Sequence, residues 1–392
     1  MDSHSVYVHV PFCTHRCGYC DFNTYAGLEN LIPRYVDALI KEVRFFSQAA
    51  GSRLPIHSIF FGGGTPSLLP MHEIERVLNE LESNFDFSSP VEITLEANPG
   101  TLSYSQLKGL GQLGINRLSM GVQSAKPEDL RVLERQHNFG DAINAVKWAR
   151  QAGFDNINLD WIFGLPGQSL ESWDRNLEMA MAMNPEHLAL YALSIEHGTP
   201  FRDMSDRGVL ALPDADLAAD MYELAMEKLG KAGYVQYEIS NWAKLDVGGK
   251  PFVCRHNLQY WRNLPYVGLG AGAHGYVAGR RTVNTLGPGA YIQRLQNGIP
   301  TEFPSTPATA SLAPVGLAGE MGETMMMGLR LVQEGVSKSR FKSRFDSSLE
   351  DHYGSVVQRL LENGLLTNGT GDAIKLTHRG KMLGNQVFME FV

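Results

Sequence analysis

The first two-thirds of the chain alternate short apolar segments with longer amphipathic ones, and this alternation limits the fold more than any other feature. The apolar segments have the length of strands, and the stretches between them carry apolar residues at helical spacing. The expected strands are residues 6–10, 56–61, 91–96, 117–122, 157–161 and 187–193. Helices between successive apolar strands are typical of a buried parallel sheet. The pattern therefore predicts an α/β fold, an incomplete barrel of six β/α units.

The remaining residues predict two further segments. Residues 1–235 form the expected barrel core, and residues 236–314 form an extension rich in Pro, Gly and Asn that closes the site. Within that extension, Gly268–Tyr276 is expected to make a tight glycine-rich turn at the edge of the site. Residues 315–392 are expected to form a C-terminal helical, winged-helix-like domain, with three short helices and a hairpin at residues 374–388.

Composition excludes several classes of protein. The formal net charge of −8 gives no general attraction to nucleic acid or to an anionic membrane surface. No apolar run reaches the length of about 18 residues that a membrane-spanning helix needs, and the first residues lack the pattern of a secretory signal. Three of the four cysteines lie within eight residues, which argues against a disulfide framework. We therefore expect a cytoplasmic protein.

Cys13, Cys17 and Cys20 follow the first expected strand, and their spacing predicts a [4Fe-4S] cluster. Three thiolates leave one iron without a protein ligand, and that iron can bind S-adenosylmethionine (SAM). A structural zinc site is the alternative, but it would need a fourth ligand such as His9 or His15.

Polar groups end the neighbouring strands, where the loops of a parallel barrel carry its chemistry. Gly62–Gly64 ends the second strand and lets the backbone come close to a ligand. Glu96 ends the third strand with a carboxylate suited to the ammonium group or to a ribose hydroxyl of SAM. Gln123, Arg135 and Asp160 add neutral, cationic and anionic groups on the same rim.

The cysteine motif together with GGGTP, residues 62–66, resembles the radical SAM superfamily. The segments TLEANP, RLSMGVQS and DWIFGLPGQ narrow the resemblance to the coproporphyrinogen III oxidase-like group of that superfamily. The resemblance implies cluster ligands Cys13, Cys17 and Cys20. It also implies the SAM-binding positions Tyr7, Tyr19, Gly63, Gly64, Thr65, Glu96, Gln123, Arg135 and Asp160. Two features depart from the oxidase pattern: Asp21-Phe22 stands where another cysteine would follow, and only twelve residues precede Cys13.

Cys254–Trp261 contains an HNxxYW motif, which resembles the heme chaperones of this group. The resemblance implies heme binding through His256, Asn257, Tyr260 and Trp261, with Cys254 as a second possible ligand. It further implies transfer of heme to an apo-hemoprotein acceptor, a respiratory enzyme being one such acceptor. Two enzyme alternatives stay open: an oxygen-independent coproporphyrinogen III oxidase, and a methyltransferase-like or cyclopropanase-like radical SAM enzyme.

Overall fold

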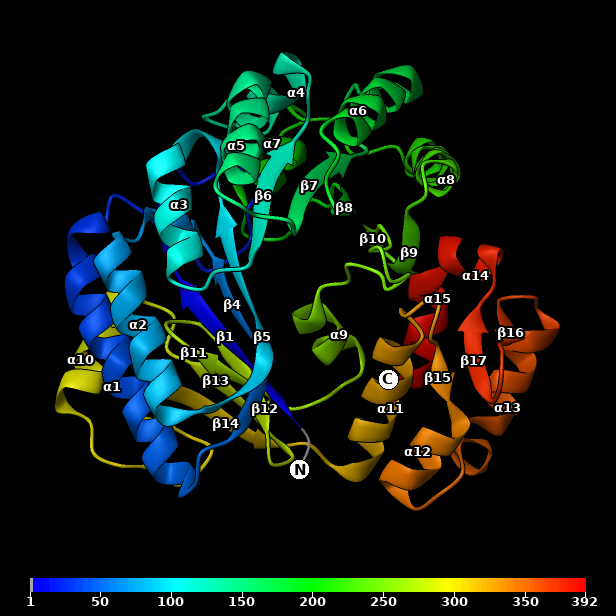
Figure 1. The fold of residues 1–392 in the computed structure, drawn as a ribbon. Helices are drawn as coiled ribbons and strands as arrows, with labels where there is room; N and C mark the ends of the chain where they lie inside the picture. Colours follow the sequence, from blue (N-terminus) through cyan, green and yellow to red (C-terminus); the bar gives the residue numbers. More distant parts are fainter. Residues whose placement is uncertain (1–2) are drawn as a thin grey trace.

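A curved, twelve-stranded sheet organises the computed structural model, which describes residues 3–392 (Figure 1). Its centre is six parallel strands in the order β1-β4-β5-β6-β7-β8. These strands are β1 His4–Val10, β4 Pro55–Gly63, β5 Asp86–Ala97, β6 Arg117–Gln123, β7 Ile157–Phe163 and β8 His187–Ala192. The sheet bends into an arc that does not close, which confirms the predicted incomplete barrel of six β/α units.

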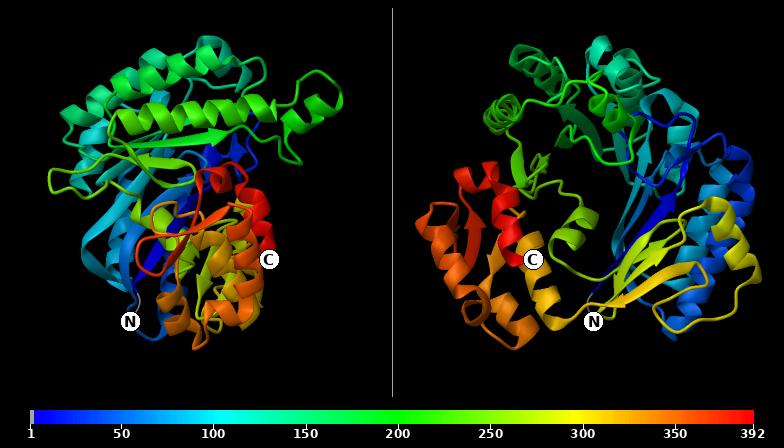
Figure 2. Two further views of the ribbon diagram at one scale, coloured as in Figure 1. Left: turned by 90° about the vertical axis from the view of Figure 1, so that its right-hand side faces the viewer. Right: turned by 180° about the vertical axis from the view of Figure 1, so that it is seen from behind.

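Helices cover the convex side of this arc (Figure 2). Six of them match the predicted amphipathic stretches: α1 Ile32–Ala50, α2 Met71–Asn84, α3 Tyr104–Gln112, α5 Phe139–Gln151, α6 Leu170–Ala182 and α8 Ala215–Lys231. Two short helices, α4 Pro127–Val132 and α7 Pro200–Asp206, were not predicted. Both begin with proline at the first helical position, where its missing N–H costs nothing.

The two faces of the sheet differ in polarity, although the parallel strands look almost continuously apolar in sequence. Val6, Ile59, Ile93 and Leu118 belong to the large apolar core that the outer helices complete. The residues that alternate with them point to the concave side. The register places Thr94 beside Arg117, and it places Glu96, Ser119, Asn158 and His187 in one row across four strands. The concave side is therefore lined by hydrogen-bonding groups.

Additional strands extend both edges of the sheet. At one edge, β10 Asn241–Ala243 pairs antiparallel with β8, and β9 Val235–Glu238 pairs with β10. At the other, β11 Tyr266–Leu269 pairs with β1, followed by β12 His274–Val277, β13 Arg280–Asn284 and β14 Thr309–Pro314. α10 Pro288–Asn297 lies against α1 (Figure 1).

These edge strands correct the prediction of a single tight turn at Gly268–Tyr276, because only the middle of that segment turns. Gly268 belongs to β11, and a side-chain Cβ added to it would lie 1.9 Å from the His274 carbonyl oxygen of β12. The glycine is there to let two strands approach closely. The glycine-rich composition of this segment therefore suggested a turn where the structure has a strand.

The C-terminal unit has its own apolar core and lies beside the open side of the arc (Figures 1 and 2). Its helices are α11 Leu317–Gly328, α12 Lys338–Phe345, α13 Leu349–Glu362, α14 His378–Met382 and α15 Gly384–Phe388. A small sheet combines β15 Val336–Ser337, β17 Ala373–Leu376 and β16 Leu366–Asn368. The three helices and hairpin of the predicted winged-helix-like module are present. The hairpin is residues 366–376, however; Thr377 caps α14, and α15 follows it over Gly384–Phe388.

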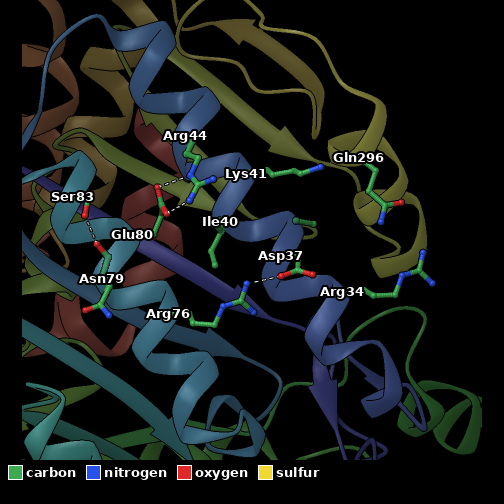
Figure 3. A pocket seen from close by; sticks show the side chains of 11 residues that line it. Arg34, Asp37, Ile40, Lys41, Arg44, Arg76, Asn79, Glu80, Ser83 and Gln296 are labelled. Carbon is green, nitrogen blue, oxygen red and sulfur yellow. Dashed lines mark hydrogen bonds and ion pairs between the residues drawn. The ribbon is translucent and has the colours of Figure 1, made fainter.

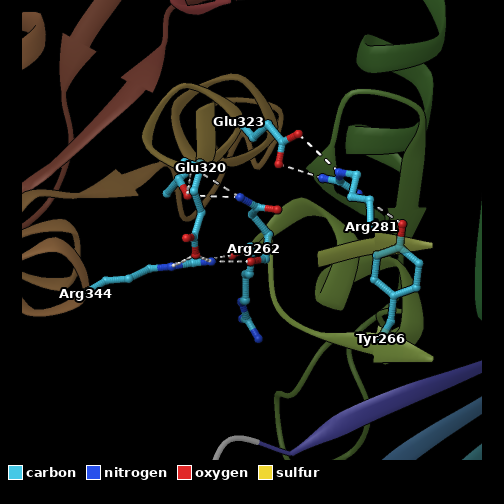
Figure 4. Close-up of polar contacts among 8 residues, drawn as sticks. Arg262, Tyr266, Arg281, Glu320, Glu323 and Arg344 are labelled. Atoms are coloured by element: carbon cyan, nitrogen blue, oxygen red, sulfur yellow. Dashed lines mark hydrogen bonds and ion pairs between the residues drawn. The ribbon is translucent and has the colours of Figure 1, made fainter. Parts of the chain in front are cut away.

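An ion pair and a hydrogen bond attach the C-terminal unit to the barrel (Figure 4). Arg281 of β13 binds Glu323 of α11, with 2.6 Å between Nη2 and Oε2. Arg344 of α12 pairs with Glu320 inside the C-terminal unit, and it donates across to the main-chain oxygen of Asn263, 2.7 Å away. Within residues 3–392, no helix is both long enough and apolar enough to cross a membrane.

Candidate functional site

The three clustered cysteines face one cavity at the carboxyl ends of the parallel strands. Cys13 ends the short strand β2 Phe12–Cys13, which pairs with β3 Tyr25–Ala26, and Cys17 and Cys20 lie on the loop between them. All three line a cavity of about 160 Å³, here called the cluster cavity. The other predicted positions that line it are Tyr19, Gly63, Gly64, Thr65, Glu96, Gln123, Arg135 and Asp160.

Two glycines bring the backbone of β4 against the cysteine loop. A Cβ on Gly64 would lie 2.5 Å from the Phe12 carbonyl oxygen and 3.0 Å from the Cys13 sulfur. Gly63 has a φ of 111°, and its N–H donates to the Glu96 carboxylate at 3.1 Å. Any larger residue would fill the space beside Cys13 or strain the backbone. Both glycines therefore let β4 lie close against its neighbours, Gly64 against the cysteine loop and Gly63 against the His9 ring.

Glu96 and Asp160 are half-buried carboxyl groups that line the cluster cavity. Burial raises the pKa of Glu96 to about 8, and the nearby Asp160 adds to the rise. Burial also raises the pKa of Asp160 to about 6, against hydrogen bonds from Asn158 and Ser119 that lower it. Removing carboxylates from water disfavours their charge. A cationic ligand group between the two carboxyl groups, such as the ammonium of SAM, would favour their ionised form.

Two further polar groups have unmet hydrogen-bonding capacity. Arg135 donates to the Gly121 carbonyl oxygen at 2.9 Å and lies 3.8 Å from the Cys17 sulfur, but its buried Nε has no partner. The buried side-chain oxygen of Gln123 also lacks one. Buried polar atoms are rarely left unpaired. A bound ligand with its own donor and acceptor groups would pair them, so these residues fit SAM.

The cysteine loop does not have the geometry of a mononuclear zinc site. Among residues 3–392, no three His, Cys, Asp or Glu side chains converge as the ligands of one metal ion do. His9 uses both ring nitrogens, one with the Tyr7 hydroxyl and one with the Asn23 carbonyl oxygen. His15 pairs with Glu134 on the surface. A cubane cluster needs no such convergence, because each thiolate binds a different iron.

The HNxxYW motif forms helix α9 Arg255–Trp261, which lies against the concave face of the sheet (Figure 1). His256 is 1% exposed. Its Nδ1 lies 3.1 Å from the Ser58 hydroxyl, and its Nε2 lies 2.8 Å from the Tyr260 hydroxyl. Burial lowers the pKa of His256 to about 3, which keeps the imidazole neutral. Both nitrogens are thus engaged inside the protein.

Cys254 is fully buried, and its sulfur lies 3.7 Å from the Glu92 carboxylate. Burial raises the pKa of this thiol to about 12. A neutral thiol with a hydrogen-bond partner is a poor metal ligand.

The residues of α9 face two different spaces. Asn257 lines a second cavity of about 240 Å³, here called the inner cavity, together with Tyr7. The inner cavity shares Gly63, Glu96, Ser119 and Asp160 with the cluster cavity. Trp261 instead lines a cleft of about 840 Å³ between the barrel and the C-terminal unit, here called the interdomain cleft. The structure therefore does not gather the four motif residues around one space.

A groove on the outer surface between α1 and α2 is separate from these spaces (Figure 3). Two ion pairs lie in it, Arg44 with Glu80 and Arg76 with Asp37, while Arg34 and Lys41 also line it.

Sequence reasoning missed the polar residues in the lower half of the barrel. Arg117, Asn158, His187 and Asn241 all line the inner cavity. The two-residue period of strands was the available signal, since Arg117, Ser119 and Gly121 alternate with apolar residues in RLSMG.

Comparison with known proteins places the chain in a family. Residues 7–180 match the radical SAM superfamily. A protein of Bacillus subtilis (strain 168) named "Heme chaperone HemW" is 39% identical over 390 residues, 99% of each chain. The chain belongs to the HemW family. Another HemW, from Lactococcus lactis, is 37% identical over 99% of this chain and 97% of its own.

The C-terminal unit and the whole fold agree with this membership. Residues 319–383 match the HemN C-terminal domain. The coproporphyrinogen III oxidase HemN of Escherichia coli aligns with a TM-score of 0.82 over 99% of this chain and 90% of its own, at 22% identity. At that identity the likeness shows a shared fold, so HemW and HemN chains carry different sequences on one architecture.

Proposed function

We propose that this HemW chain is a heme chaperone, which binds heme and passes it to an apo-hemoprotein acceptor such as a respiratory enzyme. The proposal rests on one observation above all, the family relationship over the whole chain with the HNxxYW motif intact on α9. Trp261 of that helix lies on the largest of the three spaces described above, the interdomain cleft.

The interdomain cleft suits a flat, apolar, dianionic ligand. Trp261, Leu264, Leu331 and Phe341 contribute apolar surface to its lining. Arg262, Arg340 and Arg344 lie around the same space, each paired with a glutamate. Burying roughly 300 Å² of porphyrin gives about 7 kcal/mol, and association costs roughly 4–15 kcal/mol. A bond to iron should therefore decide the affinity.

His256 is the proposed iron ligand, but its hydrogen bond to Tyr260 must break before iron can bind. Its Nε2 holds the Tyr260 hydroxyl, so iron can bind there only when this hydrogen bond opens. Heme binding would then exchange one partner of Nε2 for another and move α9 relative to the cleft.

We further propose that the cluster cavity holds a [4Fe-4S] cluster on Cys13, Cys17 and Cys20, with SAM beside it. Such a pair supplies one-electron cleavage of SAM. The protein's own part is placement: Glu96 faces the ammonium, and Gln123 and Arg135 offer the unpaired atoms for the remaining polar groups. Tyr7 reaches this region from the inner cavity.

The test compares His256→Ala with Tyr260→Phe in heme titrations of the full-length protein. His256→Ala should weaken heme binding at least tenfold and shift the Soret band, because the iron loses its ligand. Tyr260→Phe should bind heme as tightly as the wild type or more tightly, because it frees Nε2 while keeping the ring.

Unchanged affinity and spectrum in His256→Ala would contradict the proposed ligand. Cys254→Ala is the control for the neighbouring thiol and should leave the heme spectrum as it is. Transfer itself is tested by mixing the heme-loaded protein with an apo-hemoprotein and following the acceptor's spectrum.

A radical SAM enzyme is the second candidate, and the inner cavity is the observation that favours it. This cavity adjoins the SAM positions, and polar groups such as Arg117 and Asn158 meet there beside the aromatic ring of Phe60, as in a substrate site.

A further inference from the structure

Arg117 is a buried cation that has no partner. It lies at the start of β6 on the concave face, and its side chain is 2% exposed. Among residues 3–392 its guanidinium makes no hydrogen bond and no ion pair, and its Nε is fully enclosed without an acceptor. Arginines are mostly exposed in folded proteins, or paired when they are buried.

The two carboxyl groups that attract Arg117 are already hydrogen-bonded to other residues. Glu92 accepts the N–H groups of Arg255 and His256, at 3.1 and 3.2 Å. Asp160 accepts from Asn158 at 2.7 Å and from Ser119 at 3.4 Å. They attract Arg117 through space without contacting it. A buried charge that lacks direct contacts is costly, and arginine cannot lose its proton to avoid that cost.

The guanidinium faces the inner cavity. Asn241 lines the same space, and its side-chain oxygen also lacks a partner. Asn257 of α9 is far from Arg117 in the sequence but lines the same cavity. Unpaired polar atoms of Arg117 on β6 and Asn241 on β10 therefore belong to one cavity beside the cluster cavity.

We propose that the inner cavity is a carboxylate-binding site in which Arg117 recognises the ligand. The fork of a guanidinium matches the two oxygens of a carboxylate. Glu96 and Asp160 border the same cavity, so a singly charged anion fits better than a phosphate dianion.

The size of the cavity limits what can enter it. Its volume of about 240 Å³ lies below the range of about 300–1,000 Å³ that holds drug-sized ligands. The cavity therefore takes a small organic acid or one carboxylate arm of a larger molecule, a heme propionate being one such arm. The proposed site does not depend on the proposed heme function, because a small organic acid and a heme propionate both supply a carboxylate.

The first measurement is the stability of Arg117→Met in the ligand-free protein. Methionine is apolar and of similar length, so it should raise the midpoint of denaturant unfolding, because an unpaired buried charge is removed. Arg34→Met, the same change on an exposed arginine, should leave the midpoint unchanged. A lower midpoint in Arg117→Met would assign the residue a structural role and overturn the proposal.

The second measurement uses sodium propionate as the probe, with sodium chloride at equal ionic strength as the control. Propionate should raise the thermal midpoint of the wild type and of Arg34→Met, and should leave Arg117→Met unmoved. Arg117→Lys keeps the charge without the fork and should respond weakly. Equal responses of wild type and Arg117→Met, or no response in either, would overturn the proposal.

Heme and heme dimethyl ester then identify the source of the carboxylate. If wild type prefers heme and Arg117→Met loses that preference, the site receives a heme propionate. If both compounds bind alike while propionate still stabilises the wild type only, the site receives a separate small acid. Each result supports the site. Failure of the protein to bind heme at all would count against the chaperone function and leave the propionate result standing.

Discussion

Glu96 shows how one side chain can combine structure and recognition. It accepts the Gly63 N–H at 3.1 Å, which fixes the glycine turn, and its other oxygen is available to the cluster cavity. With a pKa near 8 the group is largely neutral at pH 7. A cation that binds beside it favours the ionised form, so binding and proton release are linked.

The affinity for SAM should therefore depend on pH through Glu96. Below about pH 8 the free carboxyl holds a proton, so affinity should rise as pH increases from about 6.5 and level off above 8. Glu96→Gln should weaken binding by about 1–3 kcal/mol, the usual loss for a charge-assisted hydrogen bond. Calorimetric titrations at several pH values in buffers of different ionisation enthalpy measure both the affinity and the released protons.

Glutamine keeps the hydrogen bond to Gly63, so the variant separates charge from folding. Its pH profile should be flatter than that of the wild type. A slope as steep as the wild-type slope would assign the titration to another group, with Asp160 next in order.

At the scale of the element, α9 depends on another strand for its N-terminal cap. Cys254 precedes the helix and makes no side-chain capping bond. The carboxylate of Glu92, from β5, accepts the N–H groups of Arg255 and His256 instead. A helix of seven residues is too short to be stable alone, so this contact and the packing of His256 hold it in the barrel.

Glu92→Ala should destabilise the protein by about 1–3 kcal/mol, because two buried N–H groups lose their acceptor. Urea denaturation measures the change. Glu75→Ala removes an exposed glutamate of α2 and serves as the matched control, with an expected change within about 0.5 kcal/mol. Equal stability of Glu92→Ala and wild type would show that the cap adds nothing to α9.

At the scale of the whole molecule, the fold of HemN is present but the space beside the cluster is small. The chain aligns with the E. coli oxidase at a TM-score of 0.82, while the inner cavity measures about 240 Å³. His256 of α9 packs against Tyr7 and Phe60, which border this cavity, and Tyr260 packs against His256. A whole tetrapyrrole exceeds the volume that remains.

Coproporphyrinogen III should accordingly not be turned over. Anaerobic incubation of the cluster-loaded protein with SAM, a reductant and coproporphyrinogen III should yield no protoporphyrinogen IX, measured as protoporphyrin after oxidation. An oxygen-independent oxidase assayed in parallel serves as the positive control. Steady product formation would make the oxidase activity the primary function.

The local sequence determined much of this protein. Alternating strands and helices predicted the six parallel units, since period and length are properties of each segment alone. The cysteine spacing and Gly63-Gly64 predicted which loops share the rim, because the carboxyl ends of parallel strands meet at one edge. The structure places eight of the nine expected SAM positions on the cluster cavity and Tyr7 on the adjoining one.

Only the tertiary structure decided what lies inside the barrel. Gly268 reads as a turn residue, and its place in β11 follows from the close approach of β12. His256 reads as an accessible ligand, yet Ser58 and Tyr260 occupy its nitrogens. Arg117 reads as an ordinary strand residue, yet it is buried without a partner. Each outcome depends on contacts between segments far apart in the chain, and a pattern within one segment carries no information about what another segment brings to meet it.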